Sequence, residues 1–165
     1  MELNEKFEES QALQLLVQDL LQLNFPELAD ADTARFRIMF TNTESDREFG
    51  RCTKLDDPMR FLLKFDYIIL IHKPEWDKMP PIERLRIVCH ELRHIALDKG
   101  NPKIRKHVAG KDADGEHLQD DFCEIASRNH DKISYRLADQ ALERMKPLTK
   151  HVILTEIQKE LATPA

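Results

Sequence analysis

The chain has 165 residues, enough for one domain with a buried core that needs no disulfides. Its net charge of -5 argues against a protein built mainly to neutralise nucleic-acid phosphates. No apolar run approaches the ~20 residues of a membrane-spanning helix, and the start lacks the basic-then-apolar order of a secretory signal. The three cysteines, Cys52, Cys89 and Cys123, have no short paired spacing. These features predict a cytoplasmic protein in a reducing compartment, without membrane contact.

The first half of the chain predicts one helix and two strands. Apolar residues recur at helical spacing from Glu8 to Leu23, which predicts an amphipathic helix. Arg35 to Phe40 alternates apolar and polar residues as a strand does. Phe65 to His72 is rich in aromatic and β-branched residues, which predicts a second, more buried strand. Between the strands, Thr41 to Pro58 is polar and is expected to form a loop or an irregular hairpin, with Gly50 as its turn.

The second half of the chain is predicted to be mainly helical. A helix is expected from Pro81 to Leu97, because proline suits the first turn and a glycine follows the last apolar residue. Lys99 to Glu116 is polar and is expected to be irregular. Three further helices are expected, at His117 to Asn129, Ile133 to Met145 and Leu148 to Leu161. The predicted fold class is therefore α+β, a small sheet packed by helices.

The run His90-Glu91-Leu92-Arg93-His94 lies on the helix expected from Pro81. Residues four apart share one face of a helix, so His90 and His94 can reach a single metal ion. Imidazole ligands make zinc the first expectation, and Glu91 beside them is placed to act as general base on a metal-activated water. The alternative is a pair of ordinary surface histidines. The preceding strand and the candidate ligands further along the chain favour the metal site.

A catalytic zinc needs a third protein ligand. His117 is the preferred candidate, because Asp120 and Asp121 follow it closely and could take its far ring nitrogen. His107 is a weaker candidate, since it lies among lysines and an arginine that disfavour a cation. Glu124 is the option if the third ligand is a carboxylate.

Two of the cysteines are further candidates for metal ligands. Cys89 directly precedes the motif and would point about 100° away from His90, which predicts a core residue. Cys52 resembles the upstream cysteine ligand of peptide deformylases, but the other motifs of that family are absent. Neither cysteine is therefore expected to bind the metal.

Four pieces of the sequence, taken in order, carry a resemblance to a known family. They are the strand Asp66-Tyr67-Ile68-Ile69-Leu70-Ile71, the pair Trp76-Asp77, the motif His90 to His94, and the later run His117 to Phe122. In this order they resemble the Putative phage metallopeptidase family, a minimal zincin related in style to SprT-like proteases. The resemblance covers about residues 11 to 130.

The resemblance implies a zinc metallopeptidase that cleaves a protein or peptide substrate. It implies zinc ligands at His90, His94 and His117, with Glu91 as the catalytic acid and base. The sequence departs from the family at Leu118, where an acidic residue usually follows the third histidine. The implied organisation is a zincin-like metallopeptidase domain over residues 1–130. Residues 131–165 have no counterpart in the resemblance. They are expected to form a C-terminal helical extension packed on the same domain, with a partner-binding or dimer helix as the alternative.

Two other functions stay open at this point. The first is a metal-binding interaction module without efficient turnover, which Glu91 argues against because a structural metal site has no use for a general base. The second is a SprT-like DNA-associated protease. DNA is a possible partner but not the favoured one, because the chain is acidic overall and a solvated loop explains its basic cluster more simply. That cluster comprises Lys99, Lys103, Arg105, Lys106 and Lys111.

Overall fold

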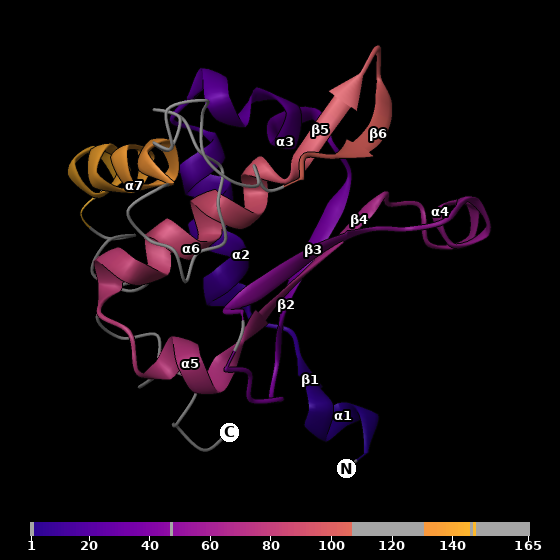
Figure 1. The fold of residues 1–165 in the computed structure, drawn as a ribbon, viewed down its shortest axis with the longest axis horizontal. Helices are drawn as coiled ribbons and strands as arrows, with labels where there is room; N and C mark the ends of the chain where they lie inside the picture. The colour runs from indigo at the N-terminus through magenta and orange to yellow at the C-terminus, as the bar shows by residue number, and fades with distance from the viewer. Residues whose placement is uncertain (1, 47, 107–130, 146, 148–165) are drawn as a thin grey trace, which may run out of the picture.

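The computed structural model describes residues 2–46, 48–106, 131–145 and 147. These residues form a four-stranded sheet, a two-stranded sheet and surrounding helices, which confirms the predicted α+β class (Figure 1). Within the described part of the chain, no helix is long and apolar enough to cross a membrane.

The larger sheet is mixed, with the strand order β1-β2-β4-β3. Its strands are β1 (Phe7–Glu8), β2 (Phe36–Thr41), β3 (Gly50–Lys54) and β4 (Tyr67–His72). Strands β2 and β4 run parallel, whereas β1 pairs with β2 and β3 pairs with β4 in antiparallel register. Gly50 lies opposite Ile71 as the first residue of β3, so its prediction as the turn of a hairpin is wrong.

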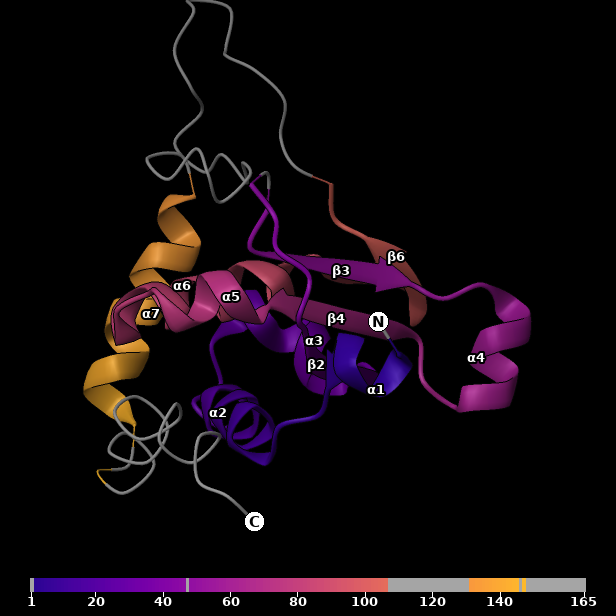
Figure 2. The same cartoon turned by 90° about the horizontal axis from the view of Figure 1, so that it is seen from below.

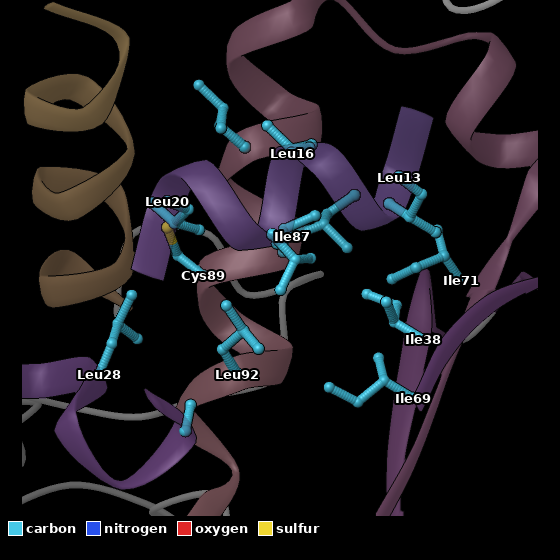
Figure 3. Close-up of a cluster of buried hydrophobic side chains, with 14 of the residues drawn as sticks. Leu13, Leu16, Leu20, Leu28, Ile38, Ile69, Ile71, Ile87, Cys89 and Leu92 are labelled. Carbon is cyan, nitrogen blue, oxygen red and sulfur yellow. The ribbon is translucent and has the colours of Figure 1, made fainter. Parts of the chain in front are cut away.

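Both predicted strands of this sheet are present, and their period of two explains which face is buried. Ile38 and Phe40 of β2 are buried, as are Tyr67, Ile69 and Ile71 of β4. Side chains alternate between the two faces of a strand, so these residues share one face. Figure 3 shows the isoleucines of this face opposite Leu13, Leu16 and Leu20 of helix α2 and Ile87 and Leu92 of helix α6.

Helix α2 (Gln11–Leu21) confirms the first predicted helix, with shorter bounds. Ser10 caps it, because its hydroxyl accepts a hydrogen bond from the backbone N–H of Leu13 at 3.2 Å. Five short helical segments were not predicted, since each is too short to show a hydrophobic period. They are α1 (Leu3–Lys6), a 3-10 turn (Pro26–Leu28), α3 (Ala29–Thr33), α4 (Asp57–Leu63) and α5 (Lys73–Asp77).

Helix α6 (Pro81–Arg93) ends four residues before the predicted bound at Leu97. The chain turns there into a hairpin of β5 (Ile95–Asp98) and β6 (Asn101–Ile104). The strand β6 also corrects the irregular structure predicted from Lys99 onward. Lys99 and Gly100 connect the strands with positive φ angles of 53° and 83°, the backbone that a two-residue hairpin turn requires.

The hairpin is fixed to the main sheet by one buried side chain. The hydroxyl oxygen of Tyr67 accepts a hydrogen bond from Lys103 N at 2.9 Å, and it lies 2.7 Å from the carbonyl oxygen of the same residue. The same hydroxyl lies 3.0 Å from the carbonyl oxygen of Ala96 on the other strand. Strand β4 therefore holds both strands of the hairpin directly after the end of α6.

Helix α7 (Lys132–Arg144) confirms the helix predicted from Ile133 to Met145. It packs against α6 through a buried face that includes Leu137, Ala138 and Ala141, and Figures 1 and 2 both show the two helices side by side. The other two predicted C-terminal helices lie outside the described residues. The division of the chain at residue 130 stays a prediction.

Candidate metal centre

The last turn of α6 carries His90 and Glu91, and His94 is the residue that ends the helix. All three are buried, and their potential ligand atoms lie within 4.8 Å of one another. The two imidazole rings are 5.1 Å apart between centroids and nearly perpendicular. One ion can therefore contact both rings. The apolar face of α6 packs in the core and so fixes the position of the two rings. It comprises Leu85, Val88, Cys89 and Leu92.

Each histidine uses its Nδ1 atom for a hydrogen bond within the protein. Nδ1 of His90 contacts a carboxylate oxygen of Asp131, and Nδ1 of His94 lies 2.6 Å from the backbone carbonyl oxygen of Arg105. Both partners can only accept a hydrogen bond, so both rings carry a proton on Nδ1. Nε2 is then the nitrogen through which either ring can bind a metal.

Glu91 is a carboxylate buried beside the two imidazoles, with 2 % of its surface exposed. Among the described residues, its Oε2 atom has no hydrogen-bond partner. Burial raises the pKa of Glu91 to about 8, and the negative charge of Glu48 adds to the rise while Arg51 opposes it. A buried carboxylate oxygen without a partner is costly, so its position beside two imidazoles fits a metal cation bound by the histidines next to it.

Gly50 sets how closely strand β3 approaches this carboxylate. A Cβ placed on Gly50 would lie 3.0 Å from both the Cδ1 atom of Ile71 and the carbonyl oxygen of Leu70. It would also lie 3.2 Å from the Cγ atom of Glu91. Any side chain at this position would therefore push against the strand or against Glu91. The sequence predicted a turn at Gly50 and gave no sign of its contact with Glu91.

We expect Gly50→Ala to destabilise the fold by about 1–3 kcal/mol, because the added methyl group overpacks the contact between β3 and α6. The stability is measured by urea unfolding. Gly100→Ala serves as the comparison for backbone strain alone, because its Cβ would meet nothing within 4 Å and only its positive φ is strained. Wild-type stability in Gly50→Ala would show that the contact is not tight.

Asp131 joins the site from the start of α7. It is fully buried, and its second carboxylate oxygen lies 2.7 Å from Nη1 of Arg93. Burial by itself would raise the pKa of Asp131, but hydrogen bonds from His90 and Ser134 and the charge of Arg93 hold it below its usual value. Asp131 was not among the site residues predicted from the sequence. The available signal was an Asp directly before a helical pattern, which marks a helix cap and not a metal site.

The remaining candidates fall into two groups. His117, His107, Glu124 and the acidic pair Asp120 and Asp121 lie outside the described residues, so the third ligand stays a prediction. The two cysteines near the site are described. Cys89 is a core residue, as predicted. Cys52 lies half-buried on β3 and is not part of the ligand cluster, and burial raises the pKa of its thiol.

Comparison with known protein families gives a match. The family described as Putative phage metallopeptidase matches residues 5–141, which is more than half of the 165 residues. No curated protein and no solved structure matches the chain. The matched region contains the buried histidines and glutamate of α6, and it extends past residue 130 into α7. A metallopeptidase acts through a metal ion, and the buried His-Glu-His group is a site where one can bind. The chain therefore belongs to the Putative phage metallopeptidase family.

Proposed function

We propose that the protein is a zinc-dependent metallopeptidase that hydrolyses peptide bonds, with Glu91 as its general base. His90 and His94 are the first two zinc ligands in this proposal, and His117 is the third. The main support is Glu91, a buried carboxylate whose Oε2 has no partner among the described residues. It lies beside two imidazoles that use Nδ1 for hydrogen bonds within the protein. A site that only stabilised the fold would not need such a group.

The chemistry follows from the positions of these side chains. A bound zinc ion would polarise the scissile carbonyl and lower the pKa of its water toward about 7. Glu91 accepts the proton of the attacking water and later donates it to the leaving amine. Burial raises the pKa of Glu91 in the metal-free protein to about 8, and the positive charge of a bound zinc ion would lower it, which would free the carboxylate to accept the proton.

Strand β3 supports a peptide as the substrate. It is the outermost strand of its sheet among the described residues. Hydrogen bonds from His72 N to Phe49 O and from Leu55 N to Asp66 O show that alternate residues of this segment face β4. The backbone N–H and C=O groups of the residues between them, such as Cys52, therefore point away from β4, toward the outer edge of the sheet. An extended peptide could pair with this edge, and Gly50 places the edge directly against Glu91.

The proposal is tested with full-length protein, loaded with zinc and incubated with a mixture of quenched fluorescent peptides. We expect cleavage that stops on addition of a zinc chelator and returns when zinc is restored. Bound zinc without any cleavage would favour the metal-binding interaction module instead. A DNA-associated protease would also show DNA binding that weakens steeply with salt.

The free thiols Cys52 and Cys89 agree with a cytoplasmic location, which we include in the proposal.

A further inference from the structure

Asp131 lies 41 residues after His90 in the sequence, yet the two side chains are in direct contact in the buried centre of the molecule. We propose that Asp131 is a positioning residue that fixes the proton and the orientation of the His90 ring for metal binding. This inference rests on the proposed zinc site, but it does not require that the protein cleaves peptides.

The two oxygens of Asp131 have different partners. Oδ2 faces Nδ1 of His90, whereas Oδ1 accepts hydrogen bonds from Nη1 of Arg93 at 2.7 Å and from Ser134 N at 3.3 Å. An ionised carboxylate offers only acceptors, so His90 must donate from Nδ1. The lone pair of His90 then resides on Nε2, the nitrogen that a metal ion would use.

Arg93 determines which oxygen of Asp131 faces His90. It is 5 % exposed, and its Nη1 also lies 3.2 Å from the hydroxyl oxygen of Ser134. A guanidinium can only donate, so it holds one oxygen of Asp131 and leaves the other for His90. Arg93 and His90 lie one turn apart on α6, and Asp131 with Ser134 forms the first turn of α7. The carboxylate therefore ties the start of α7 to the metal-binding turn of α6.

His94 is held by a different means. Its Nδ1 partner is the backbone carbonyl of Arg105, which follows β6 and which no substitution of the side chain removes. Of the two identified Nδ1 partners, Asp131 is therefore the one that a point mutation can test. Metal binding at His90 depends on the docking of α7, whereas at His94 it depends on the β5-β6 hairpin.

The test is Asp131→Asn, which keeps the size of the side chain. The donor Arg93 will draw the oxygen of the new amide toward itself, so the amide NH2 faces His90. Nδ1 of His90 must then accept, and the proton moves to Nε2. We expect zinc affinity, measured by competition with a chromophoric chelator, to fall about 10–100-fold. Asp139→Asn is the matched control, because this side chain lies on the same helix and is 60 % exposed.

Nitrogen NMR of the metal-free protein provides a readout that does not depend on activity or on zinc. In the wild type the His90 proton is expected on Nδ1, and in Asp131→Asn on Nε2. A wild-type protein with the His90 proton on Nε2 would overturn the inference, even if the variant failed to fold. So would unchanged zinc affinity in folded Asp131→Asn. If these results are as expected but no peptide is cleaved, the inference stands and the peptidase proposal fails.

Discussion

Glu91→Gln is expected to reduce peptide hydrolysis by about 10²–10⁴-fold, the usual contribution of a general base. Gln has nearly the size of Glu but cannot accept the proton of the attacking water. The metal ligands are unchanged, so the variant should bind as much zinc as the wild type. Single-turnover cleavage of one identified peptide, together with the zinc content of the same preparation, measures both quantities.

The metal-free form of the same variant serves as a control for folding. The unfolded chain ionises Glu91 near the usual pKa of 4.5, whereas the metal-free fold keeps its proton up to about pH 8. The folded state therefore binds more protons across this window, and wild-type stability falls as the pH rises through it. Glu91→Gln does not titrate and should melt at a higher temperature than the wild type at pH 8. Full hydrolysis by a folded, zinc-loaded Glu91→Gln would show that Glu91 is not the base.

His94→Ala is expected to lower zinc affinity by more than the 10–100-fold expected for loss of a supporting hydrogen bond, because it removes a direct ligand. The change is measured by competition with a chelator. His72→Ala is the matched control. His72 is also a mostly buried histidine whose Nδ1 contacts a backbone carbonyl, that of Thr43 at 2.7 Å, but it is not part of the ligand cluster. Equal zinc affinity in the two variants would exclude His94 as a ligand.

The parts of the fold that could be predicted are those that local patterns determine. Strands β2 and β4 show their burial as an alternation of residues, and α2 and α7 show theirs as a helical period. The end of α6 could not be predicted in this way. Ile95 continues the helical spacing of apolar residues, but the contact of Tyr67 with β5 and β6 favours a hairpin. That contact joins residues about 30 positions apart, and local spacing carries no information about it.

The residues of the candidate site also fall into those that local spacing predicts and those that only tertiary packing brings together. The spacing of His90 and His94 placed two potential ligands and Glu91 together, because one helical turn is enough to do so. Asp131 could not be found, since its contact with His90 depends on how α7 docks on α6. The close approach of Gly50 to Glu91 could not be predicted either, because it arises from the pairing of β3 with β4. Residues that complete a site through tertiary packing leave no local pattern.

The most direct test is the zinc content per chain of the purified full-length protein, measured by plasma mass spectrometry for the wild type and for His117→Ala. We predict about one zinc per wild-type chain and much less in the variant, as expected for a catalytic site with three protein ligands. One zinc in both proteins would move the third ligand to His107 or Glu124. A wild-type chain that retains no zinc, even after zinc is supplied and the excess removed, would contradict the assignment of a metal centre at His90 and His94.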